Sequence, residues 1–151
     1  MTDIMDAATR SRLMARVRAT DTKPEIALRR ALFALGFRYR LYRKDLPGKP
    51  DIVLPKYHAV IFIHGCFWHG HDCELFRLPK TRPEFWQAKI DANRARDARN
   101  RARLEEAGWR SLEIWECAMR GHGRWEFDQL VRAVSDWLVS NHGSTEVHGR
   151  A

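Results

Sequence analysis

The side chains best suited to binding a metal are gathered in one short segment, HGCFWHGHDC, which spans residues 64–73. It contains Cys66, His71 and Cys73. A third cysteine, Cys117, follows an apolar stretch far along the chain, so three thiols and one imidazole could converge. Zinc binds both ligand types strongly and takes four of them in tetrahedral structural sites. The alternative is that the cysteines are buried free thiols, but the polar, histidine-rich character of the segment favours a structural zinc site.

A second set of side chains could hydrolyse a phosphodiester bond. Asp51 opens one short apolar segment and His64 ends the next, so pairing of the two segments would bring them together. Mg²⁺ prefers oxygen ligands such as a carboxylate, and an imidazole of His64 or His69 can take a proton from water. Turn chemistry would explain Asp51 alone, and a lone histidine is most often a surface loop residue. The cluster as a whole favours a hydrolytic site.

Asp97 is a further candidate for this site. It lies seven residues from both Ile90 and Leu104, which places it on the inward line of a predicted helix. An unpaired buried carboxylate is costly, so Asp97 needs a partner. A protonated histidine or a metal-bound water would serve, and an ion pair with Arg94 or Arg101 is an equal alternative.

The charge of the chain indicates a polyanionic partner. Among its 151 residues, 27 lysines and arginines stand against 19 acidic residues, which gives a formal charge of +8. Surface charge for solubility is the alternative, but the arginines are clustered in NRARDARNRAR, which favours nucleic acid. The residues expected to contact DNA there are Arg94, Arg96, Arg99 and Arg101. We find no membrane-spanning run and no signal peptide, and we expect a cytoplasmic protein in which three cysteines form no disulfide framework.

The predicted elements place these residues on a mixed sheet flanked by helices, an α/β fold with the order α-β-β-β-α-β-α. A short basic helix is expected at 11–18, before the capping box of Thr22 and Glu25, which by itself would explain Glu25. A second box, Thr81 with Glu84, begins a long helix that ends near residue 107. The other expected elements are a helix ended by Gly36, a strand in 37–42, a hairpin of 51–55 with 59–63, a strand over 109–116 and a helix over 127–138. We predict one domain over 1–141, with a disordered tail at 142–151.

Several motifs resemble the very short patch repair endonucleases, a family that nicks DNA at T:G mismatches. HGCFWH with a downstream WEC is the most specific of these, and the resemblance covers roughly residues 9–120. The motifs are DTKPE (21–25), LPGKPDIVLP (46–55), VIFIHGCFWHGHDC (60–73), TRPEFW (81–86), NRARD (93–97) and GWRSLEIWECA (108–118).

The resemblance implies a restriction-endonuclease-like fold and Mg²⁺-dependent hydrolysis on the 5′ side of the mismatched thymine. Asp51 would hold two Mg²⁺ ions, with the backbone carbonyl of Ile63 as a further ligand. His69 would be the general base or lie next to the attacking water. The remaining catalytic residues are implied to be His64 and Asp97, which support the transition state, and Glu25, at the edge of the site.

The resemblance also assigns the cysteines and the aromatic residues of the loop. One structural zinc ion would be bound by Cys66, His71, Cys73 and Cys117. Aromatic side chains would wedge into the DNA beside the mismatch, and these are Phe67, Trp68 and Trp86. Core packing is the alternative for the aromatic pair. The implied partner is double-stranded DNA with a T:G mismatch, contacted also by the basic segment 1–20, and the protein would be a monomer that works with other repair proteins.

Two features depart from common patterns. Many relatives carry a small polar residue at the position of Ile63, and the Glu-x-Lys half of the common nuclease signature does not follow Asp51. Two alternatives to the mismatch-specific enzyme therefore stay open, namely a related restriction or homing nuclease and a zinc-stabilised DNA-binding module without catalysis. Asp51, His64, His69 and Asp97 together argue against the second, because a pure binder needs none of them.

Overall fold

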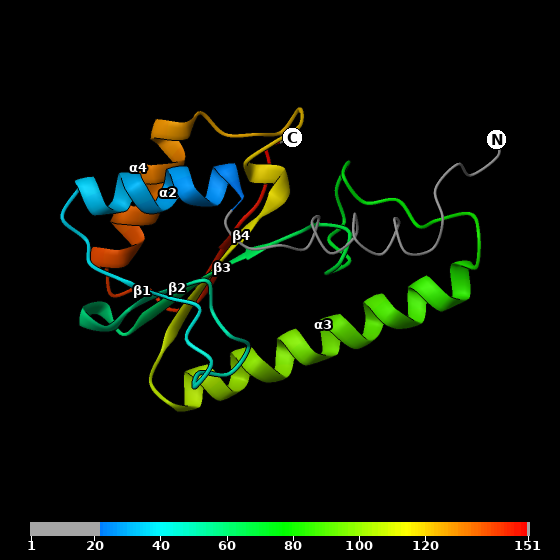
Figure 1. Cartoon of the computed structure of the whole chain (residues 1–151), viewed down its shortest axis with the longest axis horizontal. Helices are drawn as coiled ribbons and strands as arrows, with labels where there is room; N and C mark the ends of the chain where they lie inside the picture. The colour runs from blue at the N-terminus through cyan, green and yellow to red at the C-terminus, as the bar shows by residue number, and fades with distance from the viewer. Residues whose placement is uncertain (1–21, 151) are drawn as a thin grey trace.

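The fold is a five-stranded mixed sheet with helices on both faces (Figure 1). The computed structural model describes residues 22–150, so the helix predicted at 11–18 and the basic segment 1–20 lie outside the described residues. The strands follow chain order across the sheet. They are β1 (Arg40–Leu41), β2 (Ile52–Leu54), β3 (Ala59–His64), β4 (Arg110–Trp115) and β5 (Thr145–Val147).

The pairing directions confirm the predicted hairpin and the mixed sheet. β1 with β2 and β2 with β3 are antiparallel, whereas β3 with β4 and β4 with β5 are parallel. A parallel pair needs a long crossover, and α3 (Pro83–Glu106) supplies it between β3 and β4. The parallel register aligns His64 with Trp115, so both strands end at the same edge of the sheet.

The core lies mainly on one face of the sheet, under α2 (Lys23–Ala34) and α4 (Phe127–Val139). The strands alternate between the two faces, as the pleat requires. Fully buried side chains on the α2 and α4 side include Leu28, Leu32, Ile52, Leu54, Ile61 and Ile114. A smaller cluster on the opposite face consists of Val53, Val60, Phe62 and Leu104.

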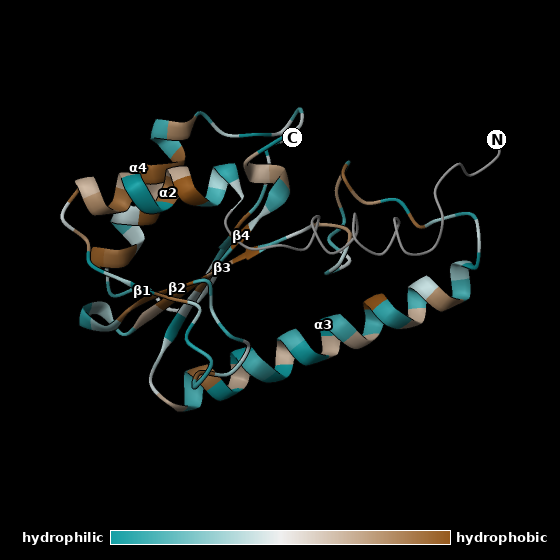
Figure 2. Cartoon of the chain, in the orientation of Figure 1, coloured by the Kyte–Doolittle hydropathy of each residue, from teal (hydrophilic) through white to brown (hydrophobic). Residues whose placement is uncertain are grey.

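The long helix α3 contributes little to the core. Of its 24 residues only Ile90 and Leu104 are buried, and Figure 2 shows that most of its residues are hydrophilic. It lies on the face of the sheet opposite α2 and α4 (Figure 1). A helix with so little apolar contact leaves most of its arginine-rich surface open to solvent.

The helix ends agree with the predictions better than the helix starts. Gly36 and Gly108 follow α2 and α3 with φ of +99° and +88°, as predicted for C-terminal glycines. Thr22 is the N-cap of α2 and Pro24 lies in its first turn, as predicted, but neither helix start has the side-chain capping hydrogen bond that a capping box requires. Thr81 stands one residue before Arg82, which is the N-cap of α3 and has a left-handed backbone.

The predicted disordered tail is wrong for residues 142–150. β5 adds to the parallel side of the sheet, with Leu112 opposite Thr145 and Ile114 opposite Val147. The approach to β5 is also bonded, because the Ser111 backbone N–H donates to the Ser144 hydroxyl at 2.9 Å. Three strand residues bounded by glycines and polar residues give too short a pattern to be recognised without the neighbouring strand.

None of the helices described within 22–150 is long and apolar enough to cross a bilayer.

Arg110 joins three separate parts of the chain at the start of β4. Its guanidinium donates to the carbonyls of Trp137, Leu138, His142 and Tyr57 at 3.0, 3.0, 3.0 and 3.3 Å. It also stacks 4.4 Å from the centre of the Trp137 ring. A cation at the last carbonyls of a helix is favourable for both hydrogen bonding and the helix dipole.

We expect Arg110→Met to lower the free energy of unfolding by about 2–3 kcal/mol, because the carbonyls lose charged hydrogen-bond donors. Arg132→Met is the matched control, since Arg132 is an exposed arginine on the same helix α4. Urea unfolding followed by circular dichroism measures both variants. Equal losses in the two would show that the contacts of Arg110 add no net stability.

Candidate active site and metal centre

A pocket opens where β3 ends beside α3, and it collects most of the predicted catalytic residues. Asp51 comes from the turn before β2, His64 from the end of β3, His69 from the following loop and Asp97 from α3. The pocket is lined by Gly48, Lys49, Asp51, Phe62, Ile63, His64, His69, Asp97, Asn100, Arg101 and Glu113. The sequence segments that contribute to it are thus far apart in the chain and meet only through the sheet.

Asp51 is held in place by the neighbouring strand. Its Oδ2 accepts a hydrogen bond of 2.6 Å from the backbone N–H of Ile63, which confirms that the hairpin brings Asp51 to the end of β3. Burial raises the pKa of Asp51 to about 7 in spite of this hydrogen bond. A bound cation would favour the ionised carboxylate again, so the site fits a divalent metal by charge and by donor type.

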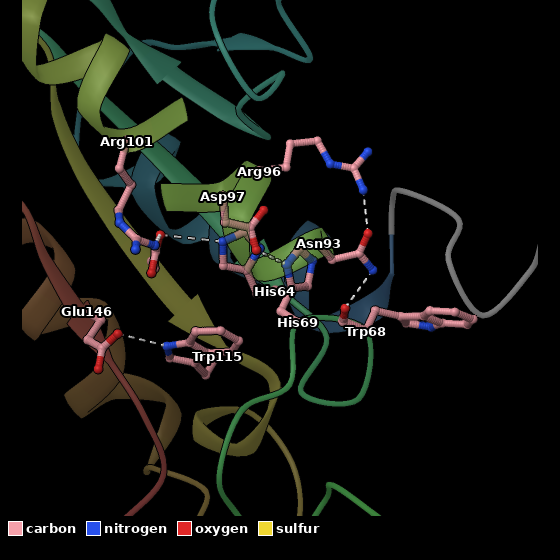
Figure 3. A network of polar contacts seen from close by, with 10 residues as sticks. His64, Trp68, His69, Asn93, Arg96, Asp97, Arg101, Trp115 and Glu146 are labelled. Atoms are coloured by element: carbon pink, nitrogen blue, oxygen red, sulfur yellow. Dashed lines mark hydrogen bonds and ion pairs between the residues drawn. The ribbon is translucent and has the colours of Figure 1, made fainter. Parts of the chain in front are cut away.

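His69 and Asp97 form a direct pair between the loop and α3. The Nδ1 atom of His69 lies 2.5 Å from Oδ2 of Asp97 (Figure 3). The partner of Asp97 is therefore a histidine, one of the two predicted kinds, and not Arg94 or Arg101. The pair orients the ring, and it leaves Nε2 as the nitrogen of His69 that faces other groups.

His64 lies against His69 and is more deeply buried. The two ring centres are 4.0 Å apart, and Phe62 and Trp115 enclose the His64 ring at 5.4 and 5.1 Å. Burial lowers the pKa of His64, which is only 6% exposed. His64, His69 and Asp97 offer ligand or proton-transfer atoms that lie within 4.8 Å of one another.

Glu25 makes side-chain contacts that the capping-box interpretation does not include. It is 3% exposed, and its carboxylate accepts a hydrogen bond of 2.6 Å from the Tyr42 hydroxyl. Arg29 lies 3.8 Å from the same oxygen. Glu25 does not line the pocket, but after burial and the Ile63 hydrogen bond its charge is the next contribution to the pKa of Asp51. That influence agrees with a place at the edge of the site.

Two charged residues of the pocket were not identified as an active-site pair from the sequence. Glu113, on β4, is 4% exposed. Its Oε1 accepts a 2.6 Å hydrogen bond from Arg101 and lies 3.7 Å from Nε2 of His64. Burial raises the pKa of Glu113, but the interactions with His64 and Arg101 outweigh it, so the pKa is lower than usual. The guanidinium of Arg101, predicted to contact DNA, is therefore paired with Glu113, although its side chain is still 41% exposed. The sequence signal that could have identified Glu113 is the presence of an acidic residue within the apolar run WRSLEIW.

Lys49 brings a second positive charge to the same pocket. It is exposed and stands two residues before Asp51, in the left-handed backbone conformation with φ of +51°. Gly48 precedes it with φ of +80°, and a Cβ there would lie 3.1 Å from the Phe62 ring. The tight turn therefore places Lys49 among the residues that line the pocket, in a chain that lacks the Glu-x-Lys half of the common nuclease signature after Asp51.

The four predicted zinc ligands converge on the other side of the His69 loop. Their ligand atoms lie within 4.8 Å of one another, and they are Cys66, His71, Cys73 and Cys117. Nδ1 of His71 is 3.6 Å from Sγ of Cys66 and 3.5 Å from Sγ of Cys117. Burial raises the pKa of both thiols, and a cation among them would reverse this preference. All three cysteines are free, so the donor set fits a tetrahedral Cys₃His zinc site.

The loop between the metal ligands packs closely on α3. Gly70 has φ of +62°, and a Cβ there would lie 2.5 Å from the Ile90 side chain. The side-chain amide of Asn93 donates to the Trp68 carbonyl at 2.9 Å. Asn93 also pairs with Arg96. The middle of the loop is therefore fixed to α3 at Trp68 and Gly70.

The three aromatic residues predicted to wedge into DNA form one partly exposed group. The ring of Phe67 lies 5.1 Å from Trp68 and 5.8 Å from Trp86, and the two tryptophans are 6.0 Å apart. Figure 3 shows the Trp68 ring pointing away from His64 and His69. The predicted arginines Arg94, Arg96 and Arg99 are exposed on α3. Their roles toward DNA stay predictions.

We expect Arg101→Leu to lower the free energy of unfolding by about 3 kcal/mol, because it leaves the buried Glu113 carboxylate without its strongest partner. The double variant Arg101→Leu/Glu113→Leu should be more stable than this single variant, since no buried charge then remains unpaired. Arg103→Leu on the exposed side of α3 is the control. Urea unfolding of these variants and of the single variant Glu113→Leu measures the coupling, and strict additivity of the two single effects would contradict it.

Comparisons with known proteins agree with this geometry. Residues 2–75 match a family model described as DNA mismatch endonuclease Vsr. Over 147 residues the chain is 43% identical to the DNA mismatch endonuclease Vsr of Escherichia coli K12, covering 97% of this chain and 94% of that protein. It is 50% identical over 126 residues to the type II nicking enzyme V.XorIIP of Xanthomonas oryzae pv. oryzae, covering 83% and 93% of the two chains. The chain therefore belongs to the Vsr family of DNA endonucleases.

Proposed function

We propose that this endonuclease nicks one strand of duplex DNA on the 5′ side of the thymine in a T:G mismatch, by Mg²⁺-dependent hydrolysis. The observation that carries the proposal is the meeting of Asp51, His64 and the His69–Asp97 pair in one pocket. The names of the relatives, which include a mismatch endonuclease and nicking enzymes, support it. A DNA-binding module without catalysis would need none of these four side chains.

Asp51 is the proposed Mg²⁺ ligand, together with the backbone carbonyl of Ile63. A carbonyl ligand is provided by any residue, so isoleucine at this position leaves the ligand set complete. Magnesium bound there would polarise the scissile phosphate and lower the pKa of a bound water. Lys49, on the same side of the pocket, would attract a phosphate oxygen by its charge.

His69 is the proposed general base. Because Asp97 accepts from Nδ1, Nε2 is free to take the proton of the attacking water, and the Asp97 carboxylate stabilises the imidazolium that forms. His64, in contact with the His69 ring and paired with Glu113, would stabilise charge on the phosphate as the bond to the leaving oxygen breaks. Glu25 would act from the edge of the site through the field at Asp51.

One zinc ion bound by Cys66, His71, Cys73 and Cys117 is the proposed source of loop rigidity. Two of these ligands flank the segment 67–70, so binding would hold the aromatic residues at both ends. Inserting a side chain into a base stack costs a few kcal/mol and costs least at a mismatch. A loop that is already ordered adds no further ordering cost, and the exposed arginines of α3 would hold the phosphate backbone.

The direct test uses labelled duplexes with a T:G, U:G or T:A pair in Mg²⁺. We expect one nick 5′ to the mismatched thymine and none in the T:A duplex. His69→Ala should retain DNA binding and lose about 10²–10⁴ in rate. Asp51→Ala should lose more, because it removes the metal ligand as well as a charge. His122→Ala, an exposed histidine outside the pocket, is the control. Near wild-type nicking by Asp51→Ala would refute the active-site assignment.

Trp68→Ala should selectively weaken discrimination between T:G and T:A duplexes. Stacking on an aromatic ring contributes about 1–3 kcal/mol per base, so we expect the affinity ratio to fall about fivefold or more. Arg99→Ala should instead make the salt dependence of binding shallower and leave the ratio unchanged. Fluorescence anisotropy over a range of salt concentrations measures both quantities. If Trp68→Ala unfolds the protein and the folded fraction keeps the ratio, Trp68 is a core residue.

A further inference from the structure

The C-terminal segment, which we define as residues 145–150, lies directly against the metal centre. Its strand β5 runs beside β4, which ends two residues before Cys117 (Figure 1). The backbone N–H of Gly149 donates to Sγ of Cys117 at 3.2 Å. A thiolate is a charged acceptor, and hydrogen bonds to charged groups are stronger than neutral ones. One of the four ligand atoms is thus held by a residue that is not itself a ligand.

A second contact of the segment acts on the histidine ligand. The carboxylate of Glu146 accepts a hydrogen bond of 3.2 Å from Nε1 of Trp115 (Figure 3). The Trp115 ring is stacked on His71 with centres 4.2 Å apart and an angle of 11° between the planes. Glu146 therefore holds the indole that in turn fixes the plane of the His71 imidazole.

The segment has little freedom to move away from these positions. The Arg150 N–H donates to the Gly123 carbonyl at 2.7 Å, and the Trp125 indole donates to the His148 carbonyl at 2.9 Å. At Gly149 the backbone passes so close to its neighbour that a Cβ would lie 2.5 Å from the Cys117 carbonyl oxygen. Only glycine fits this approach, because the atom in contact belongs to the backbone and cannot rotate away.

We propose that the C-terminal segment is part of the metal site, and that it retains zinc by holding Cys117 and His71 in their binding positions. Groups that hydrogen-bond to metal ligands orient them, and their loss typically costs about 10–100-fold in metal affinity. The inference rests on the zinc site proposed above and is independent of the reaction on DNA. It makes zinc retention a property of the last residues of the fold, far in sequence from three of the four ligands.

The experiment compares zinc retention in two glycine variants of the full chain. Gly149→Ala pushes the segment away from Cys117, whereas Gly143→Ala is the matched control, because a Cβ at Gly143 meets nothing within 4 Å. We expect wild type and Gly143→Ala to hold about one zinc per chain, and Gly149→Ala to transfer its zinc to a colorimetric chelator at least tenfold faster. The absorption bands of the Co²⁺-substituted proteins should differ between Gly149→Ala and wild type, because they report the geometry at the thiolates.

A pair of substitutions at Glu146 tests the other contact and guards against misfolding of Gly149→Ala. Glu146→Leu removes the acceptor for Trp115 and should also speed zinc release, whereas Glu146→Gln keeps an acceptor oxygen and should behave as wild type. Equal release rates for wild type, Gly149→Ala and Glu146→Leu would overturn the inference and leave the zinc site intact. Absence of zinc from purified, folded wild type would overturn the zinc site and this inference together, and wild-type nicking of T:G duplexes would then still be measurable.

Discussion

The parallel pairing of β3 with β4 is the constraint on which the rest of the structure depends. Its register sets His64 opposite Trp115, so two strands that are separated by the whole of α3 end at one edge of the sheet. Two residues beyond each strand end stand Cys66 and Cys117, and this spacing brings them to a common centre. The pocket that contains Asp51 lies at the same edge, because the Asp51 carboxylate accepts a hydrogen bond from the backbone N–H of Ile63 near the end of β3.

The loop after β3 serves both sites because it is fixed at several points. Cys66 and His71 belong to the metal centre, and His69 lies between them with its ring on Asp97 of α3. The close approach of Gly70 to α3 removes the room in which the loop could shift. The orientation of the His69 imidazole, the proposed general base, and the position of the aromatic group thus follow from the same contacts.

Most charged side chains in the pocket are paired with a group of opposite charge, because an unpaired buried charge is costly. Each of the two neighbouring histidines has a carboxylate of its own, Asp97 for His69 and Glu113 for His64. Arg101 offsets the charge of Glu113. Asp51 differs from these, because burial raises its pKa to about 7. Groups with strongly shifted pKa values are concentrated at functional sites. A cation bound from solution would favour the ionised form of the Asp51 carboxylate.

The sequence by itself determined the features that depend on neighbours in the chain. The hairpin that carries Asp51 and His64 and the glycine ends of α2 and α3 follow from local spacing and residue type. The predicted ligands Cys66, His71 and Cys73 are also close in sequence, but only the fold brings Cys117 to them. Only the tertiary structure decided the partners of Asp97, Glu25 and Arg101, because one carboxylate has many candidate cations and donors in a chain with 27 lysines and arginines. The tail was predicted to be disordered because a three-residue strand has too short a sequence pattern to be recognised. Its position is determined by the edge of β4 that it joins and by the Cys117 sulfur that it contacts.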